Sequence, residues 1–139
     1  MRKYCIFLFV LLLALGLSFA ANAEEAEPTV YQSGDYKYIL LADGTAQITA
    51  YMGNAAELIV PDVLDGYSVS SIGDRAFSSC YSLTAITLPE SLESIGTDAF
   101  ADCPKNMQFT VVRDSYAAQW CKENGLNYTY PDALDWLND

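Results

Sequence analysis

A ten-residue sequence occurs twice in this chain, as SIGDRAFSSC at residues 71–80 and as SIGTDAFADC at residues 94–103. The two copies lie 23 residues apart and are identical at six positions. A repeat of this length is typical of solenoids, in which one coil cannot bury its own apolar face and a stacked neighbour covers it. The repeat therefore predicts a stack of coils.

The repeated residues predict the structural core of each coil. Gly73 and Gly96 follow an isoleucine where the chain must bend sharply and a Cβ would obstruct. The next residues allow a single helical turn, with Asp74 or Thr97 as its cap, that directs an alanine and a phenylalanine inward. The predicted core consists of Ile72, Gly73, Ala76, Phe77 and Cys80 in one coil and Ile95, Gly96, Ala99, Phe100 and Cys103 in the next.

A second part of the repeat is a short strand. Residues 86–88 and 109–111 both read apolar–Thr–apolar at the 23-residue offset, and residues 58–60 align with 86–88 when five extra residues are allowed. Alternate residues of a strand face opposite sides. We therefore expect Ile59, Thr87 and Thr110 to point away from the core, to align across three coils, and to form a candidate binding face.

The segment before the repeats predicts a β-hairpin. Residues 36–40 and 46–50 alternate between apolar and polar, and Asp43-Gly44 lies between them. Asp-Gly is a strong signal for a type I′ turn, because Gly adopts positive φ freely.

The segment after the repeats predicts a helix and a return strand. Asp114 or Ser115 begins the helix and Gly125 ends it. Residues 126–128 can then add one strand to the stack, and residues 132–137 predict a short final helix. This helical segment would cover the exposed end of the coils.

The repeat unit resembles the BspA-like branch of the leucine-rich repeats. That family's unit reads approximately Leu-x-x-Ile-x-Ile-Pro and then Val-x-x-Ile-Gly-x-x-Ala-Phe-x-x-Cys. The first half is matched by Leu83, Ile86, Leu88 and Pro89, and the second half by Val69 and Leu92 together with the core positions of the two copies. The resemblance covers about residues 35–130. It implies a bacterial surface or secreted protein that takes part in adhesion or host-protein binding.

The expected fold class is an α+β solenoid. It is a short leucine-rich-repeat stack of about two coils, with an N-terminal β-hairpin cap and a C-terminal helical cap. The expected segments are a signal peptide at 1–23, a flexible acidic lead at 24–34, the N-terminal β cap at 35–66, the leucine-rich repeats at 67–111 and the C-terminal helix and strand cap at 112–139.

The first residues predict export. Arg2 and Lys3 precede an uncharged run of 15 residues at 6–20, and small residues follow it. The run is shorter than the roughly 20 residues that span a bilayer, which favours a cleaved signal peptide over an anchor. Cleavage after Ala20 and cleavage after Ala23 both fit. The expected location is extracellular, either released or associated with the cell surface.

Charge and composition exclude several classes of function. Without residues 1–23 the chain has 5 basic and 18 acidic side chains, a net charge of −13. Such a surface repels phosphate backbones and acidic membranes, so neither nucleic acid nor a membrane is an expected partner. The absence of histidine excludes hydrolases with an imidazole base and imidazole metal sites. No cofactor and no metal are expected.

The cysteines allow two interpretations. Cys80 and Cys103 could form a disulfide in an exported protein, or a ladder of reduced thiols that pack as small apolar residues. Stacked strands separate in-register Cβ atoms by about 4.8 Å, whereas a disulfide needs about 3.8 Å, which favours the reduced ladder. With Cys121 the number is odd, so at least one thiol stays unpaired within the chain. The sequence leaves the pairing open.

We expect a protein–protein interaction module with an extracellular or host protein as partner. One alternative is a structural or accessory domain without a dedicated ligand, and another is self-association through an open strand edge. A remote alternative is a glycoside hydrolase that uses paired carboxylates. Its candidates, Glu90, Glu93, Asp98 and Asp102, alternate with Ser and Thr without an aromatic sugar platform. The protein is therefore not expected to be an enzyme. The sequence identifies neither the ligand nor the oligomeric state.

Overall fold

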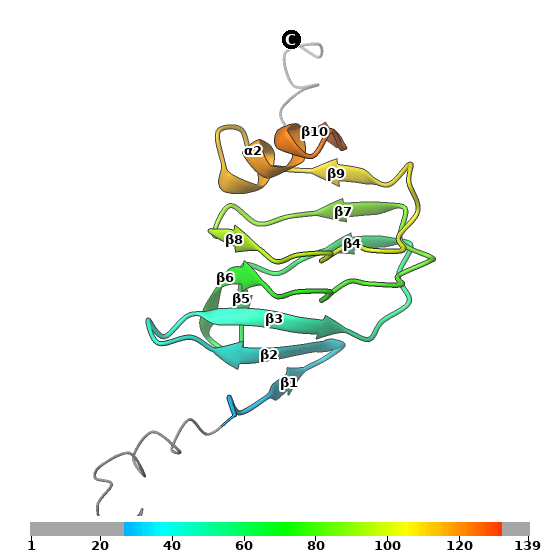
Figure 1. The fold of residues 1–139 in the computed structure, drawn as a ribbon. Coiled ribbons are helices and arrows are strands. Elements are labelled where there is room, and N and C mark those ends of the chain that lie inside the picture. Colours follow the sequence, from blue (N-terminus) through cyan, green and yellow to red (C-terminus); the bar gives the residue numbers. More distant parts are fainter. Residues whose placement is uncertain (1–26, 132–139) are drawn as a thin grey trace, which may run out of the picture.

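The computed structural model describes residues 27–131. The expected signal peptide, the start of the acidic lead and the predicted helix at 132–137 lie outside the described residues. The chain winds into a solenoid whose strands lie one above another, from β1 at one end to β10 and the helix α2 at the other (Figure 1). The predicted solenoid is confirmed.

The first strands form a β-hairpin extended by one strand. β1 (Tyr31–Ser33), β2 (Tyr36–Leu40) and β3 (Ala46–Tyr51) are antiparallel. The hairpin lies where the sequence predicts it, but its turn is not type I′. Within the turn only Gly44 has positive φ, at 84°, and its N–H donates to the Leu41 carbonyl at 2.9 Å. This is a type I turn followed by a left-handed glycine, the usual three-residue hairpin loop.

The hairpin passes directly into a ladder of parallel strands. β3 pairs in parallel with β6 (Tyr67–Ile72), and β6 pairs in parallel with β8 (Ser94–Ile95). The pair β6–β8 keeps the sequence repeat, because Ile72 faces Ile95 and the hydroxyls of Ser71 and Ser94 form a hydrogen bond of 2.7 Å. The short strand β5 (Val63–Leu64) pairs antiparallel with the start of β6.

A second ladder contains four parallel strands, β4 (Glu57–Ile59), β7 (Ala85–Thr87), β9 (Gln108–Thr110) and β10 (Asn127–Thr129). The estimate of about two coils is therefore too low. It counted coils that carry the complete motif. β4 and β10 extend the ladder through main-chain hydrogen bonds, which do not need the motif residues.

The turns between the two ladders are not helical, which corrects the predicted helical turn. Arg75 and Asp98 have φ of 57° and 54°, and a residue in the left-handed region interrupts a helix. The main chain bonds to the next coil instead. Asp74, expected to cap its own turn, accepts a hydrogen bond of 2.8 Å from the Thr97 N–H one coil away.

A close contact between coils requires the second repeated glycine. A Cβ on Gly96 would lie 2.5 Å from the backbone nitrogen of Asp74. Backbone atoms cannot move aside, so any other residue would force the coils apart. The φ of Gly96 is not in the left-handed region, and the glycine is therefore required by close packing and not by a special backbone conformation.

Aromatic rings form a continuous column along the solenoid. Tyr36, Tyr51, Phe77, Phe100 and Trp120 make successive ring contacts with centroid distances of 5.3, 5.6, 5.2 and 5.7 Å. Phe77 and Phe100 are stacked at an interplanar angle of 10°. Phe77, which has a ring on either side, is 0% exposed. We call this set the aromatic column.

The helix α2 (Tyr116–Glu123) lies at the end of the stack. Of the two candidates for its N-cap, Ser115 caps the helix by accepting from the Ala118 N–H at 3.1 Å. Gly125, with φ of 64°, follows the helix as the sequence predicts. Its inner face buries Ala117, Ala118 and Cys121. Within residues 27–131, no helix is both long enough and apolar enough to cross a membrane.

Replacement of Phe77 by alanine should lower the free energy of unfolding by about 3–5 kcal/mol, because the change opens a cavity in the centre of the aromatic column. Urea denaturation followed by circular dichroism measures the loss. Tyr81→Ala is the control, since Tyr81 is an aromatic residue that is 72% exposed, and its loss should change stability by no more than about 0.5 kcal/mol. Equal effects of the two changes would contradict the assignment.

Candidate protein-binding surface

The outward side of the second ladder is a regular surface built from four strands. The central residue of each strand, Leu58, Ile86, Phe109 or Tyr128, belongs to the core or packs against it. The residues before and after it point the other way, because side chains alternate along a strand. The outward residues, which we call the sheet face, are Glu57, Ile59, Ala85, Thr87, Gln108, Thr110, Asn127 and Thr129.

The strand register brings the three predicted face residues into one row. Ile59 is the partner of Thr87, and Thr87 is the partner of Thr110. The row continues to Thr129, which the sequence analysis did not include. The similarity of Gln108-Phe109-Thr110 to Asn127-Tyr128-Thr129 could have identified it, but the offset of 19 residues differs from the repeat.

The sheet face is nearly uncharged. Glu57 is its one charged residue, although the chain as a whole has a net charge of −11. Ile59 is 76% exposed, the most exposed of the large hydrophobic residues described, and Thr87 and Thr110 are half-buried beside it. The surface therefore combines an exposed apolar side chain with amide and hydroxyl groups that can donate and accept hydrogen bonds.

The predicted core residues are placed as a core, with one difference between the coils. Ile72, Gly73, Ala76 and Phe77 of the first copy are buried, and Cys80 is half-buried. In the second copy only Ala99 is buried, and the remaining members are half-buried: Ile95, Gly96, Phe100 and Cys103. The second copy is less covered because no further coil follows it.

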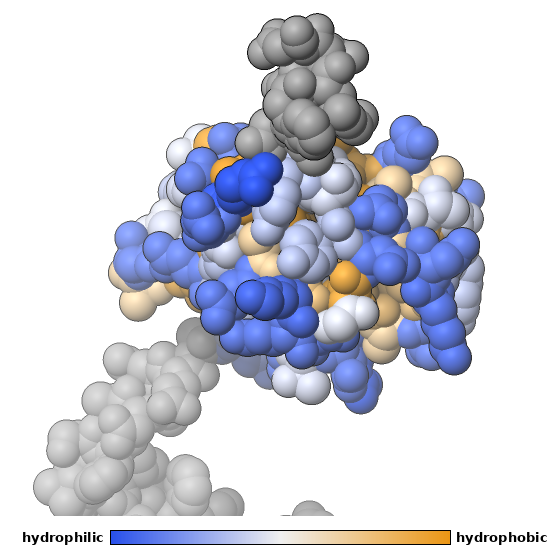
Figure 2. Space-filling model, turned by 90° about the horizontal axis from the view of Figure 1, so that it is seen from above, coloured by the Kyte–Doolittle hydropathy of each residue, from blue (hydrophilic) through white to orange (hydrophobic). Residues whose placement is uncertain are grey.

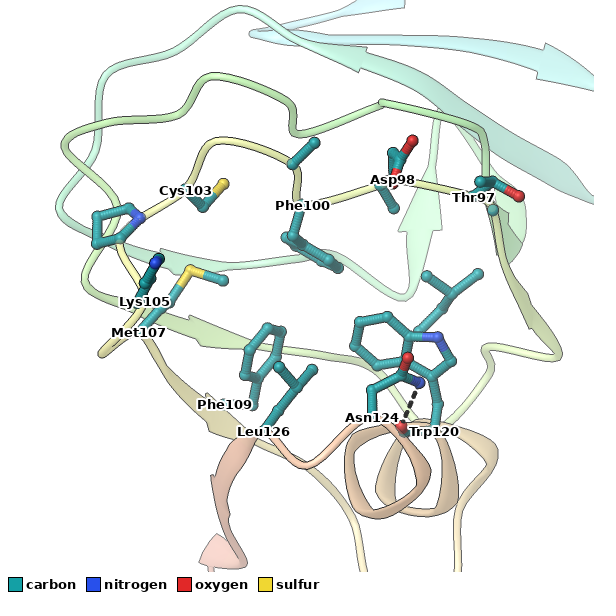
Figure 3. Close-up of a pocket in the computed structure, with 15 residues that line it drawn as sticks. Thr97, Asp98, Phe100, Cys103, Lys105, Met107, Phe109, Trp120, Asn124 and Leu126 are labelled. Atoms are coloured by element: carbon teal, nitrogen blue, oxygen red, sulfur yellow. Dashed lines mark hydrogen bonds between the residues drawn. The ribbon is translucent and has the colours of Figure 1, made fainter.

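A groove of about 690 Å³ lies between this less covered coil and α2. Figure 3 shows Phe100, Met107, Phe109 and Leu126 directed toward its centre, with Trp120 of α2 on the opposite wall. Asp98 and Lys105 lie at its rim (Figure 3). Seen from this end of the solenoid, hydrophilic residues cover most of the surface and apolar residues are visible between them (Figure 2).

The thiols of Cys80, Cys103 and Cys121 are free. Cys80 and Cys103 occupy equivalent positions in consecutive coils, and the Cys103 thiol donates a hydrogen bond of 3.1 Å to the Phe77 carbonyl. Burial raises the pKa of both thiols. Cys121 is 0% exposed, and burial raises its pKa to about 12. None of the three has the lowered pKa of a reactive thiol.

The candidate carboxylates do not form an enclosed site. Glu90, Glu93, Asp98 and Asp102 are all exposed, whereas a catalytic acid depends on an enclosed environment that raises its pKa. In the part of the chain that the structure describes, no group of three or more metal-ligating side chains comes together. Asp65 has a structural contact, because its carboxylate accepts hydrogen bonds from Tyr38 at 2.7 Å and from Ser33 at 2.9 Å.

The comparisons with known proteins agree with this architecture. Residues 54–119 match the family described as BspA type leucine rich repeat region, with six copies. The repeat region of this chain is therefore a leucine-rich repeat region of the BspA type. No curated protein matches the sequence.

Three solved structures are similar to the chain. A leucine rich cell surface protein from Faecalibacterium prausnitzii A2-165 is 33% identical with a TM-score of 0.58, covering 78% of this chain and 31% of that one. A leucine-rich repeat protein from Bacteroides capillosus ATCC 29799 is 29% identical, with a TM-score of 0.47 and coverages of 59% and 71%. A leucine rich repeat protein from T. pallidum is 27% identical, with a TM-score of 0.50 and coverages of 59% and 43%. This chain thus spans less than a third of the Faecalibacterium chain.

The cysteines should differ in their reaction with iodoacetamide at about pH 8. Cys80 and Cys103 should be modified before Cys121, which is both inaccessible and protonated at this pH. Mass spectrometry of peptides from timed, quenched reactions measures each rate. In guanidinium chloride the three rates should become similar, and modification of Cys121 in the native protein as fast as the others would contradict its burial.

Proposed function

We propose that this chain is a secreted interaction module that binds an extracellular or host protein through the sheet face. The observation that carries the proposal is the nearly uncharged strip around the exposed Ile59 on an otherwise strongly acidic chain. The centres of protein interfaces are depleted in charged residues. An acidic protein therefore gains a binding site where its own charge is absent, since desolvation of unpaired carboxylates is costly.

The regular geometry of the sheet face supports the same function. Four parallel strands hold Ile59, Thr87, Thr110 and Thr129 in register. Threonine is stiff at χ1, so little side-chain entropy is lost when a partner covers these positions. A partner would place an apolar group against Ile59 and hydrogen-bonding groups against the row of hydroxyls.

The proposed location is extracellular, by way of a signal peptide at residues 1–23. The basic start and the uncharged run of the sequence support this, as does the description of the Faecalibacterium relative as a cell surface protein. We further propose an acidic lead at 24–34, an N-terminal β cap at 35–66, repeats at 67–111 and a C-terminal cap at 112–139. The function is recognition and not catalysis, which the exposure of the four candidate carboxylates supports.

The double substitution Thr87→Arg and Thr110→Arg should abolish partner binding without changing the melting temperature, because two long charged side chains would cover the row. Residues 24–139 serve as bait for chemical cross-linking with extracellular bacterial and host material. Each captured protein is then purified and its affinity for the bait is measured by calorimetry. The expected loss of affinity is at least about tenfold.

The matched control is Ser82→Arg with Asn106→Arg, which adds the same charge at two exposed positions outside the sheet face. This variant should retain full affinity. If both variants bind the captured protein as tightly as the unchanged chain, the sheet face is not the binding site.

A further inference from the structure

The turns of consecutive coils are joined by a ladder of main-chain hydrogen bonds that runs in one direction. In the first repeated coil the N–H groups of Arg75, Phe77 and Ser79 each donate to a carbonyl of the next coil. The acceptors are Thr97, Ala99 and Ala101, at 3.1, 2.8 and 2.8 Å. Every second residue of one turn is thus satisfied by the turn that follows it.

The second repeated coil has the same donors and no turn after it. The positions equivalent to Arg75, Phe77 and Ser79 are occupied by Asp98, Phe100 and Asp102, whose backbone N–H groups have no acceptor among residues 27–131. The left-handed conformations of Asp98 and Asp102, with φ of 54° and 58°, repeat those of the first coil. The three N–H groups therefore keep the alternating arrangement of a ladder that lacks its last member. We call them the open rung.

The helix α2 covers only part of this end. It contributes the Trp120 ring, which lies 5.7 Å from Phe100, but it cannot complete the rung, because helical carbonyls are used within the helix. Phe100 consequently remains half-buried, whereas Phe77 is fully covered. The groove of about 690 Å³ lies directly beside the open rung and is lined by both Asp98 and Phe100.

We propose that the open rung binds an extended, basic peptide segment of a partner protein. Carbonyl oxygens at three alternate residues of the segment accept hydrogen bonds from the N–H groups of Asp98, Phe100 and Asp102. Addition of an extended segment to an unpaired backbone edge is a known mode of peptide recognition. One apolar side chain of the segment enters the groove and covers Phe100 beside Trp120. This site is separate from the sheet face of the proposed function.

The charges at the rim determine the chemistry of the segment. Asp98 and Asp102 are exposed at either end of the rung, Lys105 is the one cationic residue that lines the groove, and the chain is strongly acidic. Lysine or arginine in the segment would pair with the two aspartates, and the overall charge would accelerate the encounter. A segment that follows the coil also needs glycine wherever the coil has positive φ.

A second copy of this chain does not fit the open rung in a symmetric dimer. Two identical rungs would face each other with N–H groups only, and donors cannot pair with donors. The acidic surfaces of two copies would also repel each other. A partner that supplies carbonyls and positive charge satisfies both conditions.

Amide hydrogen exchange measured by NMR tests the proposal directly. The probe is a synthetic peptide, acetyl-SIGKGAFKGS-amide, which follows the repeat but carries lysine and glycine at the relevant positions. Without it, the amides of Asp98, Phe100 and Asp102 should exchange rapidly, whereas those of Arg75, Phe77 and Ser79 should already be protected. With excess peptide the first three should slow by at least about tenfold. A peptide of the same composition in scrambled order should have no effect.

The variant Asp98→Arg with Asp102→Ser tests the charge requirement. It places in the second coil the residues that the first coil has at the same positions, Arg75 and Ser79, so the backbone should tolerate it. Affinity for the peptide should fall by at least about tenfold at physiological salt. The control, Glu90→Arg with Glu93→Ser, makes the same change of charge at exposed positions elsewhere and should bind normally.

The Thr87→Arg and Thr110→Arg variant separates this proposal from the proposed function, because it should bind the peptide with unchanged affinity. The open rung is rejected if about 1 mM peptide leaves the three amides unprotected. It is also rejected if the peptide protects amides of the sheet face instead, or if both charge variants lose affinity equally.

Discussion

The contact at which one coil lies against the backbone of the previous coil determines the structure. A Cβ on Gly96 would lie 2.5 Å from the Asp74 nitrogen, so this position accepts only a hydrogen atom. The close approach has two results. The N–H groups of one turn reach carbonyls of the next at 2.8–3.1 Å, and the rings of Phe77 and Phe100 stack with centroids 5.2 Å apart. A side chain at this position would weaken the hydrogen bonds and the stacking together, which ties hydrophobic packing to main-chain pairing.

The same stacking creates two surfaces with different chemistry. Along the side of the solenoid, the main chain of each strand is used within the ladder and only side chains are presented, so recognition there depends on residue identity. At the end of the solenoid the main chain itself is available, because the last turn has donors without acceptors. A chain with few coils has a large proportion of end relative to side. The end is therefore a larger part of the functional surface here than in a long array.

Much of the architecture could be predicted from the sequence, because the 23-residue offset reappears as strand register. Ile72 lies beside Ile95 and Thr87 beside Thr110. The number of coils could not be predicted, since β4 and β10 join the ladder through the main chain. The shape of the turns was also missed, because Arg75 and Asp98 adopt a conformation usually associated with glycine. In the same way, the row from Ile59 to Thr110 was predictable, whereas the open rung depends on knowing which N–H groups find acceptors.

The in-register repeat has an evolutionary consequence. Because Ile86 faces Phe109 and Ile72 faces Ile95 with the same spacing, insertion of one whole unit between them would reproduce existing contacts and would create no new kind of packing. Unequal recombination within the gene can therefore change the length of such an array in single steps while the fold persists. A deletion of any other length would reverse the inward and outward faces of a strand or break its register. The number of coils can thus vary between related genes independently of the stability of each coil.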